Sequence, residues 1–161
     1  MARYSLLVPL AVACGAAPAL LGAQAPIPVG RWSANIRPTL APSSGIGAST
    51  MKMYGSINVT PNRAGAAGSW LVEIRLTSDR PSETLLWAIA PGRCQSGAVP
   101  EVQPNQLAPL EVRANGNADI SAAVTLSMNP SDSYHLDIFR NGQQQEHVIA
   151  CASLRYSEQK K

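Results

Sequence analysis

Short runs of alternating apolar and polar residues constrain the fold of this chain more than any other feature. In the clearest run, Trp70–Leu76, the apolar residues Trp70, Val72, Ile74 and Leu76 occupy every second position. Successive side chains of a β-strand point to opposite faces of the sheet, so this spacing predicts a strand with one buried face.

Similar short runs recur along the chain, and no stretch shows the periodicity of an amphipathic helix. Proline, glycine and asparagine–glycine turn signals separate the runs. The pattern favours an all-β fold, an eight-stranded Greek-key β-sandwich or flattened barrel. We expect strands at residues 32–36, 54–60, 70–76, 84–90, 110–113, 120–126, 134–138 and 147–154.

One turn signal also predicts which strands are neighbours. Asn115-Gly116 is a typical two-residue hairpin turn, so we expect residues 110–113 and 120–126 to form a β-hairpin. The apolar residues of the second arm alternate, and they predict one inward-facing row: Ile120, Ala122, Val124 and Leu126.

Residues 1–25 have the pattern of a secretory signal peptide. Arg3 supplies the positive charge, residues 6–21 are apolar or small, and Ala23-Gln24-Ala25 fits a small-x-small cleavage site. The main outcomes are cleavage at this site and lipidation at Cys14, which follows a lipobox-like segment. A retained membrane anchor is a third outcome, and Pro9 and Pro18 disfavour it. We therefore expect an exported protein, periplasmic or secreted, with no membrane span after the signal is removed.

The remaining chain is long enough for one hydrophobic core. We expect a single domain at residues 26–155 and a flexible tail at residues 156–161. Without Arg3 of the signal, 12 of the 13 Lys and Arg residues remain against 10 Asp and Glu residues. The basic residues are scattered along the chain, so the sequence does not predict a nucleic-acid partner.

Export also bears on whether the cysteines form a disulfide. Once the signal is removed, only Cys94 and Cys151 remain. An even pair in an exported chain most simply forms one disulfide, and two buried free thiols are the alternative.

Three segments together carry a family resemblance: Trp87-Ala88-Ile89-Ala90, Gly92-Arg93-Cys94 and Ala150-Cys151. Their order and spacing resemble the copper/zinc superoxide dismutase-like superfamily, and more closely its exported bacterial domains. In those domains a Trp-His-x-His strand precedes a Gly-x-Cys turn, and an Ala-Cys strand ends the fold. The resemblance covers roughly residues 53–155 and implies a dismutase-like Greek-key scaffold. A chordin-type (CHRD) domain is the second family that the pattern resembles.

The chain departs from this family at the positions that carry its chemistry. Ala88, Ala90 and Phe139 stand where the resemblance implies copper-binding histidines, and Val148 stands where it implies an anion-guiding arginine. Copper and zinc sites need nitrogen, sulfur or carboxylate ligands, which these side chains lack. We therefore expect no catalytic residues, no metal site and no cofactor.

These substitutions favour a non-catalytic, exported binding or structural domain whose partner is an unknown protein or envelope component. Ala88, Ala90 and Phe139 would then form an outward-facing apolar patch suited to such a partner. The alternatives are a metal-dependent superoxide dismutase and a CHRD-like extracellular domain.

Two further patterns have simple structural interpretations. Ser133, His135 and Asp137 occupy alternate positions of one expected strand, so they would point outward in parallel instead of converging like a catalytic triad. We interpret them as a polar, solvated strand face. Met51 and Met53 also alternate, and we expect core or edge methionines there, not a Cu(I) site.

Overall fold

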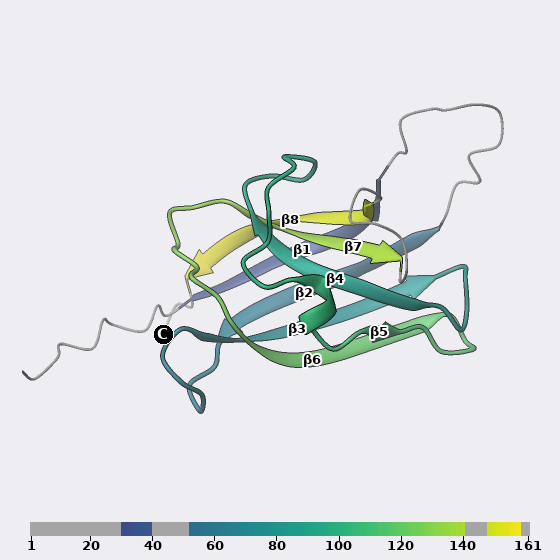
Figure 1. Cartoon of the computed structure of the whole chain (residues 1–161), viewed down its shortest axis with the longest axis horizontal. Coiled ribbons are helices and arrows are strands. Elements are labelled where there is room, and N and C mark those ends of the chain that lie inside the picture. Colours follow the sequence, from purple (N-terminus) through teal and green to yellow (C-terminus); the bar gives the residue numbers. More distant parts are fainter. Residues whose placement is uncertain (1–29, 40–51, 141–147, 159–161) are drawn as a thin grey trace, which may run out of the picture.

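The computed structural model describes residues 30–39, 52–140 and 148–158. These residues form eight antiparallel strands and one short 3-10 turn, η1, and the strands curl into a flattened, nearly closed barrel (Figure 1). The all-β prediction is confirmed. The elements are β1 (Gly30–Pro38), β2 (Met53–Pro61), β3 (Ser69–Ser78), β4 (Thr84–Pro91), η1 (Pro104–Gln106), β5 (Leu110–Glu111), β6 (Asn117–Thr125), β7 (Tyr134–Arg140) and β8 (Val148–Glu158).

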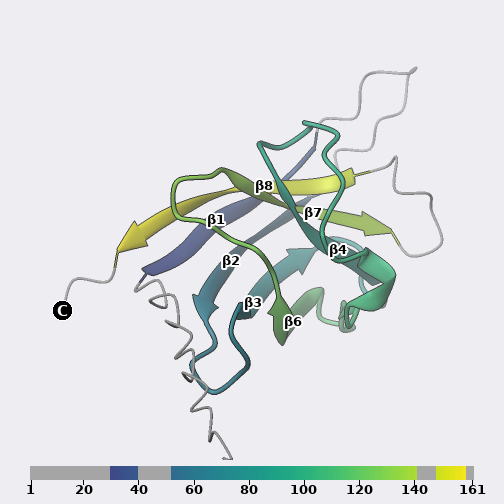
Figure 2. The same cartoon turned by 60° about the vertical axis from the view of Figure 1, so that its left-hand side comes forward.

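The order of the strands across the sheet is β5-β4-β7-β8-β1-β2-β3-β6. The last strand is central in this order, because β8 pairs with β7 on one side and with the first strand, β1, on the other. Figure 2 shows the strands curving around a common interior. Non-consecutive strands are neighbours at several points, as in a Greek-key fold.

The core follows the alternation of the sequence. Trp70, Val72, Ile74 and Leu76 of β3 all face inward with 4% or less of their surface exposed. In the register of β2 and β3, Ile74 lies opposite Ile57, which is completely buried as well. The predicted inward row of β3 is therefore confirmed.

Two tryptophans of the core pair their indole N–H groups with backbone carbonyl oxygens. Trp70 Nε1 donates a hydrogen bond to the carbonyl oxygen of Leu126 at 3.0 Å. Trp87 Nε1 donates to the carbonyl oxygen of Ala108 at 2.8 Å, which ties the segment before β5 to the interior. Buried indole groups usually find such a partner, because an unpaired N–H is costly to desolvate.

The predicted Asn115-Gly116 turn forms, but its two arms do not pair as a ladder. Gly116 has a φ of 81°, and the amide of Arg113 donates to the carbonyl of Asn117 at 2.9 Å. Beyond that contact β5 pairs with β4, whereas β6 pairs with β3 over nine residues. The expected hairpin is therefore wrong in its pairing, because each arm finds a different neighbour across the barrel.

The last strand is longer than the expected residues 147–154. It continues to Glu158, which lies opposite Gly30 of β1, so residues 156–158 belong to the sheet and not to a tail. The alternation continues through Leu154 and Tyr156, and β1 offers an edge to pair with. The expected signal peptide with Cys14, and also Met51, His147 and residues 159–161, lie outside the described residues.

Within the part of the chain that the structure describes, no helix is long and apolar enough to span a membrane.

Candidate functional site

The outer face of β4, β7 and β8 contains the positions that the family resemblance singled out. On this face Ala88 lies opposite Asp137, Ala90 opposite His135, and Leu86 opposite Phe139. Phe139 in turn lies opposite Val148 on β8. The fold therefore brings the four substituted positions onto three adjacent strands.

This face is covered, so the expected exposed apolar patch is wrong. Ala88 is 1% exposed, Ala90 2% and Phe139 6%. A partner cannot contact side chains that are already removed from solvent. The alternation of β4 and β7 predicted that these residues point away from the core, but it does not predict what lies over them.

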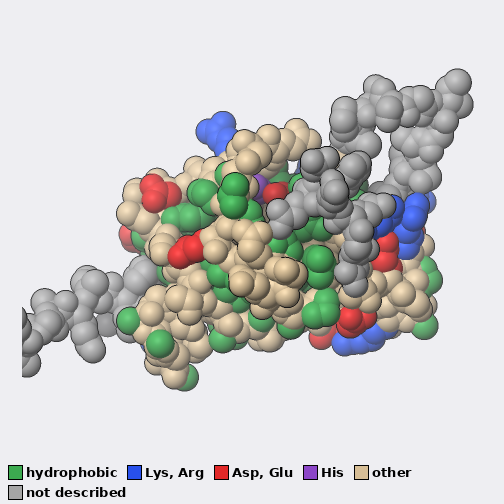
Figure 3. All heavy atoms as spheres, in the orientation of Figure 1, with side chains coloured by type: hydrophobic (Ala, Val, Ile, Leu, Met, Phe, Trp, Pro, Cys, Tyr) green, Lys and Arg blue, Asp and Glu red, His purple; other side chains and the backbone are tan. Residues whose placement is uncertain are grey.

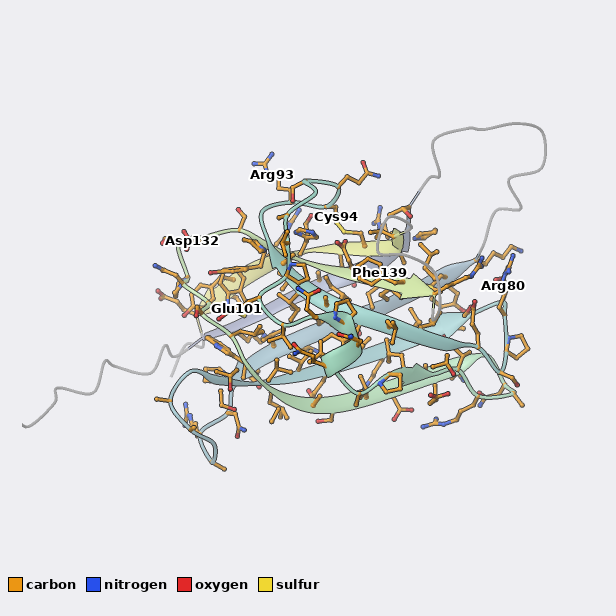
Figure 4. The ribbon with its side chains drawn as sticks, viewed as in Figure 1. Arg80, Arg93, Cys94, Glu101, Asp132 and Phe139 are labelled. Atoms are coloured by element: carbon orange, nitrogen blue, oxygen red, sulfur yellow. A yellow bond between two sulfur atoms is a disulfide. The ribbon has the colours of Figure 1, made fainter. Side chains whose placement is uncertain are left out.

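A disulfide holds one end of the β4–β5 connection against this face. Cys94, three residues after β4, is bonded to Cys151 of β8, as the cysteine count predicted. Ser153 Oγ also donates to Cys94 Sγ at 3.4 Å. Figure 4 shows Cys94 close to β8, while Arg93 points away from the barrel. The connection is therefore fixed to the last strand by a covalent bond.

A buried ionic pair lies beneath this connection. His135 Nδ1 is 3.2 Å from the carbonyl oxygen of Gly92, and His135 Nε2 is 3.2 Å from Asp137 Oδ2. When Asp137 is ionised both partners can only accept hydrogen bonds, so both contacts are satisfied together only when both ring nitrogens carry a proton and the imidazole is charged. In Figure 3 only a small purple area of histidine is visible on the face shown.

The same contacts set the pKa of His135. Burial lowers this pKa, but the hydrogen bond to Asp137, the charge of Asp137 and the hydrogen bond to Gly92 together raise it above 6.5. His135 is 1% exposed, so the expected solvated strand face is wrong at this residue. Ser133, by contrast, is exposed and lies just before β7.

The residues on this face do not fit a copper or zinc ion. Alanine and phenylalanine side chains offer no ligand atom, and both nitrogens of His135 are already hydrogen-bonded. Among the described residues, no three His, Cys, Asp or Glu side chains gather closely enough to hold a metal. Met53, considered above as half of a thioether pair, is a core residue with 1% exposure.

A second feature, which the sequence analysis missed, is a polar groove on the outer face of β8, β1 and β2. Its volume is about 630 Å³. We call it the β1 groove, because β1 forms its floor between the two neighbouring strands. The residues that line it are Ser33, Ala34, Asn35, Arg37, Ser56, Ile57, Asn58, Ser153 and Arg155.

The polar side chains of the β1 groove project outward because they alternate with core residues. On β1, Ser33 and Asn35 flank Ala34, and on β2, Ser56 and Asn58 flank the buried Ile57. In the register of these strands Ser33 lies opposite Asn58, and Asn35 lies opposite Ser56. Short side chains at four neighbouring positions leave the centre of the sheet face low, which produces a shallow hollow.

The charged residues of the β1 groove are both arginines. Arg37 and Arg155 are exposed, and neither forms an ion pair or a side-chain hydrogen bond within residues 30–39, 52–140 and 148–158. No carboxylate lines the groove. The hollow is therefore a positively charged surface whose guanidinium donors are available to a ligand.

The sequence did carry a signal for this groove, because the outward positions of β1 and β2 hold serine and asparagine in succession. That signal becomes informative only once the strand order places β8 beside β1.

Comparison of the chain with protein-family models and with curated proteins gave no match.

Proposed function

We propose that this protein is a non-catalytic, exported binding domain on a superoxide dismutase-like scaffold, and that it binds its ligand in the β1 groove. The observation that carries the proposal is the groove itself, a hollow of about 630 Å³ lined by seven polar side chains. The hollow is open and mostly polar, so it suits a polar ligand that lies along the sheet and not an enclosed apolar one.

The polar groups of the groove are available for binding. Within the described residues, no hydrogen bond or ion pair engages the side chains of Asn35, Ser56 or Asn58. Hydroxyl and amide groups can both donate and accept, so such a surface matches a polar ligand. By contrast, the face that the resemblance linked to metal chemistry is covered and lacks ligand side chains.

Two features support export. The Cys94–Cys151 disulfide is compatible with an oxidising compartment, because cytosolic thiols are normally kept reduced. The N-terminal sequence has the charge, apolar stretch and cleavage pattern of a signal peptide.

A groove-filling substitution tests the proposal. Ser56→Trp places a large ring on the β2 side of the groove, and Ser121→Trp adds the same bulk at an exposed outward position of β6, outside the groove. We expect at least one compound of a panel of sugars, acidic sugars, dicarboxylates and amino acids to shift the NMR amide signals of β1, β2 and β8. Ser56→Trp should abolish these shifts, and Ser121→Trp should preserve them.

The proposal is overturned if no compound shifts these amides, or if the shifts persist unchanged in the folded Ser56→Trp variant. Folding of both variants is checked first, by comparing their amide spectra and unfolding midpoints with those of the unsubstituted protein.

A further inference from the structure

We infer that the ligand of the β1 groove is an acidic polysaccharide, an extended sugar chain that carries carboxylate groups. The inference rests on the proposed function and names the chemical class that the groove recognises. It follows from the spacing of the two arginines, the neutral groups between them, the position of β1 within the sheet, and one exposed tyrosine.

The two arginines lie toward opposite ends of the β1 groove. Arg155 lies opposite Ser33, and Arg37 lies four residues further along β1, opposite Cys151. Four residues of a strand span on the order of 13 Å. This spacing of the two backbone positions suits a polymer with repeated negative charges, because separate carboxylates of the polymer can pair with each guanidinium.

The groups between the arginines are neutral and form hydrogen bonds in both directions. Ser33, Asn35, Ser56, Asn58 and Ser153 provide hydroxyl and amide groups, which donate and accept. A sugar hydroxyl has the same double capacity. The groove therefore offers positive charge at its ends and hydroxyl-compatible groups along its floor.

The charges around the groove do not cancel the attraction of its two arginines for an anionic ligand. The next strand, β3, places Glu73 opposite Asn58 and Arg75 opposite Ser56, so it adds one charge of each sign. Arg37 and Arg155 remain without an acidic partner in the described part of the chain.

The position of β1 argues against a peptide that binds as an added strand. Such a peptide needs an open sheet edge with free backbone groups. β1 lies between β8 and β2: it pairs with β2 over residues 32–36 and with β8 at residues 30–33 and 37–38, so it is not an edge strand. The groove therefore offers a ligand the outward side chains of interior strands and no open sheet edge.

Tyr54 adds an aromatic surface at one end of the groove. It lies on β2 two residues before Ser56, so both side chains point to the same side of the sheet. Tyr54 lies at the same end of the groove as Arg37. Their sequence neighbours, Gly55 and Ile36, lie opposite each other in the register of β2 and β1. Tyr54 is 63% exposed, and its ring offers an apolar face with a polar tip, which suits the C–H face and the hydroxyls of a sugar.

Two polysaccharides that share the same sugar backbone, one charged and one neutral, test the inference. Polygalacturonate carries a carboxylate on each sugar, and its fully methyl-esterified form is the same polymer without the charge. The full chain, purified with its disulfide formed, should bind polygalacturonate at least tenfold more tightly than the ester in isothermal titration.

Matched double variants locate the binding. Arg37→Gln/Arg155→Gln removes the two groove charges, and Arg63→Gln/Arg80→Gln removes two exposed charges from the β2–β3 and β3–β4 turns, away from the groove. Both variants lose the same net charge and keep Lys160 and Lys161. We expect the groove variant to bind polygalacturonate at least tenfold more weakly, and the turn variant to stay within about twofold.

Each other outcome overturns the inference. Equal weakening in both variants means that the protein attracts polyanions without a site, and equal or tighter binding of a single-stranded oligonucleotide means that the sugar is not recognised. If the ester binds as tightly as the acid, the ligand is a neutral sugar and the proposed function stands. If neither polymer binds, the inference fails, and the NMR panel alone decides the proposed function.

Discussion

At the scale of single residues, His135 and Asp137 form an ionic pair opposite two of the smallest side chains of the fold. Ala90 lies across from His135 and Ala88 lies across from Asp137. Small cross-strand neighbours leave room for the imidazole and the carboxylate on a covered face. The alanines that stand at the expected metal positions therefore pack against this pair.

The raised pKa of His135 predicts how stability depends on pH. Its pKa in the folded protein lies above 6.5, the ordinary value for an unfolded chain. The folded state therefore holds the proton more tightly. The contribution of His135 is fully present below pH 6.5 and is lost as the pH rises through the folded pKa. We expect the free energy of unfolding to fall over that range, measured by urea denaturation.

The His135→Gln variant is the reference for this measurement, because groups that titrate in both proteins cancel in the difference. The unfolding free energy of the original protein minus that of the variant should decrease as the pH rises above 6.5. A difference that stays constant or grows with pH contradicts the charged assignment of His135.

Sequence alone predicts only part of the environment of His135. The alternation around Tyr134–Ile138 places His135 on the outer face of its strand, and this was correct. Its burial depends on Gly92, which directly follows β4 and contacts the ring, and on the cysteine turn that comes next in the chain. Strand periodicity describes which face a side chain occupies, and it carries no information about a connection that folds over that face.

At the scale of elements, the β4–β5 connection is held by two different devices at its two ends. Cys94 attaches its start to β8, and the carbonyl of Ala108 attaches its end to Trp87 in the core. The connection is therefore attached to the last strand at its start and to a core residue at its end.

Removal of the disulfide tests how much the attachment of Cys94 to β8 contributes to the free energy of unfolding. Cys94 and Cys151 are 57 residues apart in sequence. A loop of this length restricts the unfolded chain enough to stabilise the fold by about 4 kcal/mol in the chain-entropy model. We expect Cys94→Ala/Cys151→Ala to lower the unfolding free energy by about that amount in urea denaturation. The original protein under reducing conditions should show the same loss, and unchanged stability in both would contradict the expectation.

Element boundaries were more predictable than element partners. The alternation in Trp70–Leu76 located β3 to within a few residues, because burial on one face repeats every second position. The Asn115-Gly116 turn was also found, yet its arms pair with β4 and β3. A turn brings two strands together locally, and the barrel's curvature then decides which neighbours continue the ladder.

At the scale of the whole molecule, the two outer faces of the barrel have different characters. The face over β4 and β7 is covered and includes the His135–Asp137 pair, whereas the face over β8, β1 and β2 is open, polar and basic. The sequence contains the serines and asparagines of the groove in succession, but it does not show that Ser33 and Arg155, which come from opposite ends of the chain, lie side by side. Only the strand order makes them neighbours.

The covered face predicts the metal content of the whole protein. Ala88, Ala90 and Phe139 offer no ligand atoms, and the nitrogens of His135 are occupied by hydrogen bonds. We expect elemental analysis of the purified protein to find less than stoichiometric copper or zinc, and metal-loaded protein to show no superoxide turnover. An active copper/zinc superoxide dismutase serves as the positive control. Stoichiometric copper together with turnover that a chelator abolishes would support the enzyme alternative instead.

The place of β8 in the strand order has a consequence for how the protein is made. A chain that emerges N-terminus first presents β1 and β7 before the strand that belongs between them. Until β8 has been synthesised, both strands keep an unpaired edge and Cys94 lacks Cys151, its partner in the fold. Closure of the barrel and formation of this disulfide therefore wait for the last strand, so a chain that is terminated before β8 is left open and can be recognised by its exposed edges.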